Sequence, residues 1–244
     1  MKTRRVVLSV LLSTLMSVLC WAALTRTVTE DFEGAIEEAL WRAGPEDEIV
    51  PDGGNPGAFL RNAAAVAAVP TLVTETPGSS VFTGPYGQMG VSHLGVDLEV
   101  FAVSGDVRGR PVSLGIQGGV YTGSEWISCE LIFPGDEVPQ PGSGWRAYTF
   151  GVPAWKRHMP SKVTVHGSCA DLPRDDVWRQ VIGWVSVARF YVGDPGASYE
   201  PQAWDIAFDN PRITIGKFTD HMHHDAALES DGPVPMEMAP VPNE

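Results

Sequence analysis

Residues 51–60, which read Pro-Asp-Gly-Gly-Asn-Pro-Gly-Ala-Phe-Leu, restrict the fold more than any other stretch of this chain. Two prolines and three glycines exclude a helix interior or a central strand, because proline lacks a backbone donor and glycine weakens both elements. They favour a tight turn, since glycine reaches positive φ easily and proline fixes φ. The apolar pair Phe59 and Leu60 follows directly and predicts the start of a strand.

A second signal lies near the far end, at residues 204–213, and we interpret the two stretches as neighbours in one β-sandwich. The stretch 96–103 alternates most regularly, which predicts an antiparallel strand with one buried and one solvated face. Its apolar face holds Val96, Leu98, Val100 and Ala102, and its solvated face holds Asp97 and Glu99. The 26 glycines and 20 prolines indicate a chain rich in turns, as expected for an all-β protein.

The N-terminus has the pattern of an export signal, because Lys2, Arg4 and Arg5 precede an uncharged run over residues 6–24. Two alternatives stay open. The run is cleaved, or it stays as a membrane anchor, since its 19 residues approach the roughly 20 that span a bilayer. Cys20 is a weak lipoprotein candidate. Either way the bulk of the chain is predicted outside the cytoplasm, in the periplasm, at the cell surface or secreted.

The formal net charge is −13, so the surface as a whole repels polyanions. We therefore exclude nucleic acid and anionic lipid as main partners. The acidity either attracts divalent cations or simply keeps an exported protein soluble. With Cys20 set aside, Cys129 and Cys169 remain, and two cysteines in an exported chain predict one disulfide; the alternative is two buried free thiols.

The chain divides into residues 1–24 (signal peptide or anchor), one sandwich domain over about 27–218, and a disordered acidic tail over 219–244. Within the domain, residues 36–41 predict a short helical turn and residues 175–181 a short helix. The acidic run between Glu30 and Asp52 predicts a solvated loop. Residues 134–144, rich in proline and glycine, predict another loop.

Several of these motifs together resemble the laminin B type module, also called laminin domain IV, in its bacterial exported versions. The resemblance covers residues 30–215. It implies a jelly-roll sandwich outside the cytoplasm, in adhesion or matrix roles and without known chemistry. One departure is that Trp41 follows a longer acidic insert than the family usually has. The motifs are Asp31-Phe32-Glu33, Gly54-Asn55-Pro56-Gly57, Phe82-Thr83-Gly84, Gly144-Trp145-Arg146-Ala147-Tyr148, Trp155 and Phe208-Asp209-Asn210.

Related jelly rolls often hold a structural Ca²⁺ between the first strand and the last one. The resemblance implies Asp31, Glu33 and Asp209 as candidate ligands here, with backbone carbonyls near residues 53–55. A hard cation needs six to eight oxygen ligands, so several of these groups would have to converge. The alternative is a plain turn at Asp209 and a solvated Glu33.

Exposed aromatic faces on a sandwich can bind glycans, and the candidates are Tyr121, Trp126, Trp145 and Trp155. The alternative is that these rings are buried, which is the ordinary position of a large apolar side chain. We find no catalytic constellation, because Ser79, Ser80 and Ser168 lack a Gly-x-Ser-x-Gly frame.

The sequence thus predicts a non-catalytic exported sandwich that acts in adhesion or recognition, or as an accessory subunit of a membrane complex, with a glycan or protein partner. The first alternative is a carbohydrate-binding protein, with or without calcium. The second is a glycan-active hydrolase that uses paired carboxylates such as Asp97 and Glu99.

Overall fold

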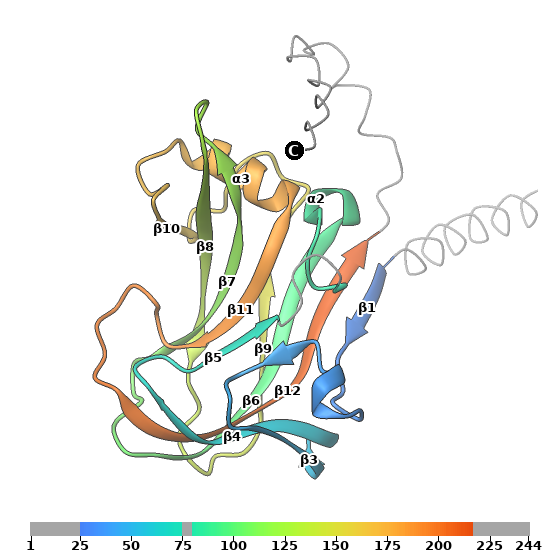
Figure 1. The fold of residues 1–244 in the computed structure, drawn as a ribbon, viewed down its shortest axis with the longest axis vertical. Helices are drawn as coiled ribbons and strands as arrows, with labels where there is room; N and C mark the ends of the chain where they lie inside the picture. The colour runs from blue at the N-terminus through green and yellow to red at the C-terminus, as the bar shows by residue number, and fades with distance from the viewer. Residues whose placement is uncertain (1–24, 75–79, 217–244) are drawn as a thin grey trace, which may run out of the picture.

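The computed structural model describes residues 25–74 and 80–216, which form two antiparallel sheets packed face to face (Figure 1). The predicted all-β antiparallel sandwich is confirmed. The predicted anchor at 1–24 and the predicted tail at 219–244 lie outside the described residues. Among the residues that are described, no helix has the length and apolar character needed to cross a bilayer.

Sheet A is organised around its longest strand, β12, which pairs with β4 on one side and with β6 on the other. Leu60 of β4 lies opposite Phe208 of β12, so the two ends of the chain are neighbours, as the sequence predicts. In sheet order the strands are β3 (Asp47–Gly54), β4 (Gly57–Ala67), β12 (Gln202–Gly216), β6 (Val91–Val103) and β9 (Arg146–Gly151), and β1 (Thr25–Thr29) also pairs with β12.

A proline interrupts this central strand. Pro211 cannot donate a ladder hydrogen bond, and the pairing of β12 with β6 shifts register between Asp209 and Arg212. Asn210 takes a positive φ of 47° at the same place. The strand tolerates the break because Glu30, just after β1, donates its backbone N–H to the carbonyl of Pro211.

Sheet B places four strands of the middle of the chain beside two short N-terminal ones. Its core-facing side follows the expected alternation. Val112, Leu114 and Ile116 of β7 are all buried. In sheet order the strands are β10 (Thr164–Gly167), β8 (Trp126–Glu137), β7 (Pro111–Tyr121), β11 (Val185–Val192), β5 (Thr71–Thr74) and β2 (Trp41–Arg42).

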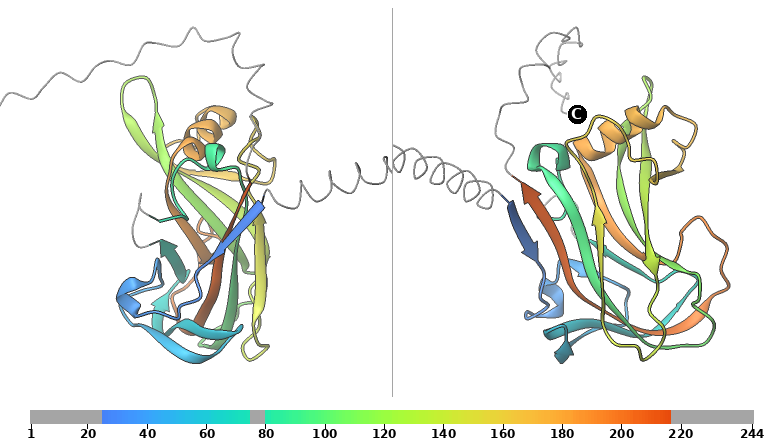
Figure 2. Two further views of the ribbon diagram at one scale, coloured as in Figure 1. Left: turned by 90° about the vertical axis from the view of Figure 1, so that its right-hand side faces the viewer. Right: turned by 180° about the vertical axis from the view of Figure 1, so that it is seen from behind.

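Two short helices, α2 (Tyr86–Met89) and α3 (Arg174–Gly183), lie at the end of the sandwich where β1 begins (Figures 1 and 2). The helix predicted at 175–181 is confirmed as α3. It buries Trp178 and Val181, and the Trp178 ring lies 6.2 Å from that of Phe133, so α3 closes this end of the core. The helical turn predicted at 36–41 is the 3₁₀ helix η1 (Ile36–Glu38).

Two predicted loops are wrong in part, because both contain strands. The acidic run between Glu30 and Asp52 includes β2 and most of β3, and β8 continues to Glu137 inside the predicted loop 134–144. In the first case Asp47, a member of that run, accepts hydrogen bonds from Asn62 and from the backbone of Ala43, which orders the chain. Acidic composition therefore did not indicate a solvated loop here.

The side chain of Phe59 lies outside the core between the sheets. It lies on the outer side of sheet A, where its ring centroid is 5.4 Å from that of Trp145 and 6.2 Å from that of Phe101. Leu60, the next residue, is the one that enters the core beside Phe208. The apolar pair therefore starts a strand as expected, but its two side chains point to opposite faces.

The disulfide predicted from the cysteine count is present and joins Cys129 of β8 to Cys169, just beyond β10. Both residues are buried. The bond closes a loop of 40 residues and holds the short edge strand β10 against β8.

Replacing both cysteines by alanine should lower the free energy of unfolding by about 4 kcal/mol, because closing a loop of this size restricts the unfolded chain. Urea unfolding with and without dithiothreitol measures the effect. The reductant should destabilise the natural chain and leave the Cys129→Ala, Cys169→Ala variant unchanged. Equal free energies of unfolding for the natural chain and the variant, both measured without dithiothreitol, would contradict the stabilising role of the disulfide.

Candidate functional site

The outer face of sheet B carries a row of polar side chains across its three central strands. Successive residues of a strand point to opposite faces, so the neighbours of the buried core residues point outward. We call this set the polar row, and its members are Gln117 of β7, Ser128 and Glu130 of β8, and Arg189 and Tyr191 of β11.

The polar row is joined by hydrogen bonds into one network. The Arg189 Nη1 donates to Glu130 Oε1 at 3.0 Å and to Gln117 Oε1 at 2.5 Å. The Tyr191 hydroxyl donates to the same Glu130 oxygen at 2.8 Å, and Gln117 Nε2 donates to the Ser128 hydroxyl at 2.7 Å. Each member is thus held in one orientation, while the Arg189 and Glu130 side chains remain partly exposed.

Two glycines of β7 leave room for neighbouring side chains to pack against the sheet, Gly115 for Tyr191 of the polar row and Gly119 for Trp126. A Cβ at Gly115 would come within 2.7 Å of the Tyr191 ring, and one at Gly119 within 3.1 Å of the Trp126 ring. Any side chain at Gly115 would therefore displace the network. Burial, and then the charge of Glu130, raise the pKa of Tyr191, so its hydroxyl stays protonated and remains a donor.

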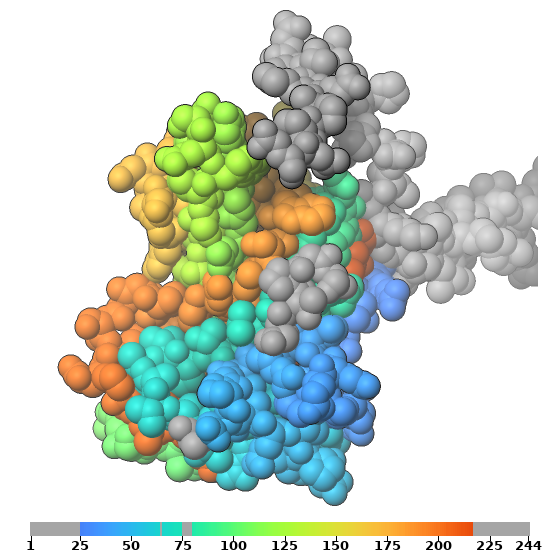
Figure 3. Space-filling view, viewed as in Figure 1, coloured from blue at the N-terminus to red at the C-terminus, as the bar shows by residue number. Residues whose placement is uncertain are grey.

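An exposed aromatic pair continues the polar row at the β7–β8 hairpin. Tyr121 and Trp126 lie opposite each other in the ladder, with ring centroids 5.5 Å apart. The Trp126 side chain is 71% exposed and the Tyr121 side chain 47% exposed. Trp184, which is 57% exposed, directly precedes β11, whose first residue Val185 pairs with Gly118. Figure 3 shows the hairpin in green and the 193–201 segment in orange on the same face of the molecule.

The structure brings together only two of the four aromatic residues predicted for a glycan site, Tyr121 and Trp126. Trp145 lies against sheet A, where its Nε1 donates to the carbonyl of Gly53 at 3.0 Å. Trp155 follows β9, on another part of the surface, and is 43% exposed. Each of the four residues was a separate candidate, and the structure places Tyr121 and Trp126 side by side while Trp145 and Trp155 lie apart from that pair.

Sequence reasoning missed the polar row and Trp184. One signal for the row was present. Residues 185–192 alternate, and this places Arg189 and Tyr191 on the same face, two residues apart. Three glycines within β7, at 115, 118 and 119, are a second signal, because glycine inside a strand often marks a close approach of other groups.

The residues predicted to bind calcium do not converge as a cluster. The part of the chain that the structure describes contains no group of three or more His, Cys, Asp or Glu side chains that could hold a metal ion. Glu33 Oε1 accepts a hydrogen bond from the backbone of Ala58, and Asp209 Oδ2 accepts one from the backbone of Asn55. Both carboxylates therefore bind the 54–58 turn, and Asp31 is exposed.

A hard cation would nevertheless offset the unfavourable burial of the Asp209 carboxylate beside other acidic groups. Asp209 is completely buried, and its pKa is raised by burial and also by the charges of Asp97 and Asp31. Both Asp209 oxygens already accept backbone N–H groups, from Asn55 and Asn210. Calcium, with Asp31, Glu33 and Asp209 as ligands, therefore stays a prediction for this turn.

Asp97, predicted on a solvated face, is instead buried beneath that turn. Arg212 Nη1 donates to its Oδ1 at 2.7 Å, and the side-chain amides of Asn55 and Asn210 donate to its Oδ2. The prediction failed because these partners come from residues far away in the sequence. Asp97 is fully used in a structural network and is not available as one of a catalytic pair with Glu99.

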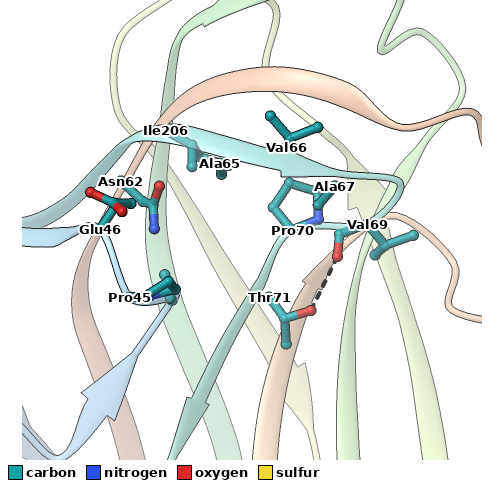
Figure 4. Close-up of a pocket in the computed structure, with 12 residues that line it drawn as sticks. Pro45, Glu46, Asn62, Ala65, Val66, Ala67, Val69, Pro70, Thr71 and Ile206 are labelled. Atoms are coloured by element: carbon teal, nitrogen blue, oxygen red, sulfur yellow. Dashed lines mark hydrogen bonds between the residues drawn. The ribbon is translucent and has the colours of Figure 1, made fainter.

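Three cavities of the described residues have no member of the polar row in their lining. One of about 330 Å³ opens between the 43–46 segment and the facing ends of β4 and β5 (Figure 4). Asn62 lines it, donating to Asp47 while its buried Oδ1 has no partner. The charged side chains of the polar row are only partly exposed, Arg189 by 26% and Glu130 by 18%.

Comparison with known proteins gives structural matches only. No family model and no curated sequence matches the chain.

A family 11 carbohydrate-binding module from Clostridium thermocellum, in complex with a mixed-linked β-1,3-1,4 tetrasaccharide, is 13% identical with a TM-score of 0.43, covering 79% of this chain and 95% of the module. The L4b domain of human laminin alpha-2 is 10% identical with a TM-score of 0.42, covering 80% and 98%. The CBM22-1 xylan-binding domain of Paenibacillus barcinonensis Xyn10C is 8% identical with a TM-score of 0.38, covering 79% and 95%. The laminin domain is thus among the β-sandwich neighbours, and nothing finer than the fold follows at these identities.

Millimolar Ca²⁺ should raise the midpoint of thermal unfolding relative to EDTA if the turn holds the ion, because a ligand of the native state stabilises it. The Asp209→Asn variant should lose this shift. Mg²⁺ at the same concentration is the control for a nonspecific ionic effect. An unchanged midpoint in Ca²⁺ would contradict the predicted site.

The pH dependence of stability should also report on Asp209. Its pKa is higher in the folded protein than in the unfolded chain, so the stability it contributes is present below about pH 4 and is lost as the pH rises through the raised pKa. Urea unfolding from pH 4 to pH 7 should show this decline in the natural chain and a flatter profile in Asp209→Asn. Identical profiles would show that the carboxyl is not perturbed.

Proposed function

We propose that this protein binds an extended carbohydrate across the outer face of sheet B, with the aromatic pair and the polar row as the contact surface. One observation carries the proposal. The exposed Tyr121–Trp126 pair adjoins a hydrogen-bonded row of side chains on the same strands, β7 and β8. Carbohydrate binding is a specific form of the adhesion or recognition role that the sequence predicts.

The rings of Tyr121 and Trp126 supply apolar contact for a ligand, and the Tyr121 hydroxyl adds a polar group. Tyr and Trp present large rigid faces that lose little entropy on binding, and a sugar ring offers a complementary C–H face. The Tyr121 hydroxyl already donates to the carbonyl of Gly123, and Gln180 accepts a hydrogen bond from the Tyr121 backbone. Tyr121 is therefore held in position before any ligand arrives, with the Trp126 ring 5.5 Å from its own.

The polar row supplies directional hydrogen bonds. Gln117, Glu130 and Arg189 together present donors and acceptors with fixed geometry, which suits the paired hydroxyls of a sugar. Fixing them through their own network reduces the ordering that binding requires. Ligand sites typically combine apolar walls with a few such placed polar groups.

The length of the surface favours an oligosaccharide. Trp126 lies opposite Tyr121, and Arg189 lies opposite Gly115 six residues earlier along β7. At about 3.3 Å per residue the surface extends about 20 Å, which exceeds a single sugar ring.

The chemistry of the row supports binding rather than hydrolysis. Glycoside hydrolysis ordinarily needs two carboxylates on opposite sides of the scissile bond. The polar row contains one, Glu130, and Arg189 is paired with it at 3.0 Å. The row therefore lacks the second carboxylate that such a reaction requires.

A glycan array followed by calorimetry tests the proposal. Trp126→Ala should weaken binding of a retained glycan at least about fivefold, since truncating a central interface aromatic typically costs more than about 1 kcal/mol. Trp155→Ala removes an equally large exposed ring elsewhere and should leave the affinity unchanged. Parallel arrays in EDTA separate calcium-dependent binding from the rest.

Two outcomes would contradict the proposal. One is that the natural chain retains no glycan in either condition. The other is that Trp126→Ala and Trp155→Ala both bind as tightly as the natural chain, because the ligand would then lie elsewhere.

A further inference from the structure

A second surface lies at the end of sheet A where β1 begins. Thr25, the first residue of β1, pairs with Gly216, and Gly216 donates to the carbonyl of Gly90. In the next strand, Val91 accepts a hydrogen bond from Ala154. These three pairings lead from β1 across β12 and β6 to Ala154, and neighbouring strands lie about 4.8 Å apart. Trp155, the residue after Ala154, therefore lies about 15 Å from Thr25.

We call residues 155–158, Trp-Lys-Arg-His, the basic loop. All four residues are exposed. The loop is nevertheless fixed on α3, because Trp178 Nε1 donates to the carbonyl of Lys156 at 2.8 Å and His158 Nδ1 lies 2.7 Å from an Asp175 oxygen. The backbone N–H of Met159, the next residue, also donates to Asp175 Oδ1 at 3.0 Å. The loop thus presents one ring and two cations on a rigid support.

The charge of this region opposes that of the rest of the protein. Residues 153–183 contain five Lys and Arg against three Asp, whereas the remainder of residues 25–216 contains eight against 21 Asp and Glu. Of the three aspartates, Asp175 faces His158 and Asp176 pairs with Arg179. Overall charge argues against anionic lipid as a partner, but the charge at this surface favours it.

The sequence before β1 indicates what this surface faces. The uncharged run 6–24 ends one residue before Thr25, so no linker separates it from the sandwich. As a helix, its 19 residues would extend about 28 Å, close to the thickness of the hydrocarbon core. A chain that keeps this run must hold the β1 end of the sandwich at the bilayer surface.

We propose that the protein keeps residues 1–24 as an anchor and docks its basic loop on anionic phospholipid headgroups. Trp155 occupies the interface, where amphipathic rings are favoured, and Lys156 and Arg157 pair with lipid phosphates. This docking uses none of the residues of the polar row. It also orients that row, which runs along β7 from this end of the molecule toward the opposite one.

Photocrosslinking of the full chain in vesicles tests the docking. Benzoylphenylalanine in place of Trp155 keeps an aromatic side chain and should form lipid adducts in vesicles that contain phosphatidylglycerol. The same residue in place of Val66 is the matched control. Val66 is 74% exposed and pairs with Ala203 near the start of β12, about 40 Å along that strand from Gly216.

Adducts at position 155 and not at position 66 support the proposal. The double variant Lys156→Glu, Arg157→Glu, and vesicles of phosphatidylcholine alone, should each lose most of the adduct. Matching thermal midpoints show that the variants fold, and the milder pair Lys156→Gln, Arg157→Gln serves if they do not.

Other outcomes overturn the proposal. These are no adduct at position 155, equal adducts at both positions, an adduct with protein or glycan instead of lipid, or an N-terminal mass showing that residues 1–24 are absent from the chain at the membrane. Glycan binding by the same variants should be unchanged. A failure of docking is therefore distinguishable from a failure of the proposed glycan site.

Discussion

The ion pair between the buried Asp97 and the partly exposed Arg212 is the interaction on which sheet A depends. It connects β6 to β12 at the register shift beside Pro211, and Arg212 also donates to the carbonyl of Tyr148 in β9. Asn55 and Asn210 satisfy the second Asp97 oxygen, so the buried charge has a full set of partners. Removing one member of such a pair typically costs about 3–5 kcal/mol, because the other charge is left buried and unpaired.

This arrangement explains why the 54–57 turn is rich in glycine. A Cβ at Gly54 would lie 2.6 Å from the carbonyl oxygen of Gly57 and 2.8 Å from Asp209 Oδ2. The turn must approach β12 closely for the Asn55 backbone to reach Asp209 at 2.6 Å. The polar groups around this turn of sheet A are thereby satisfied internally, whereas the hydrogen-bonded row of sheet B is partly exposed to solvent, where a ligand can reach it.

Sequence reasoning succeeded where the signal was local and failed where it depended on partners far along the chain. The turn at 54–57 and the stretch 204–213 predicted neighbouring strands, the alternation at 96–103 predicted an antiparallel strand, and the hairpin neighbours Tyr121 and Trp126 were both singled out. Asp97 was placed in solvent because a single strand cannot show that Arg212 will cover it. The polar row spans three strands, so no stretch of sequence contains it, and only the Arg189 and Tyr191 spacing hinted at a shared face.

The charges of the polar row also bear on the kind of sugar that suits it. Arg189 and Glu130 neutralise each other at 3.0 Å, and the remaining members, Gln117, Ser128 and Tyr191, are uncharged. The row therefore has no excess of positive charge with which to attract an acidic polysaccharide. The chain around it carries a net charge of −13, which repels polyanions at longer range. A neutral glycan meets neither obstacle, because its hydroxyls exchange hydrogen bonds with both the cation and the carboxylate while its ring faces contact Trp126.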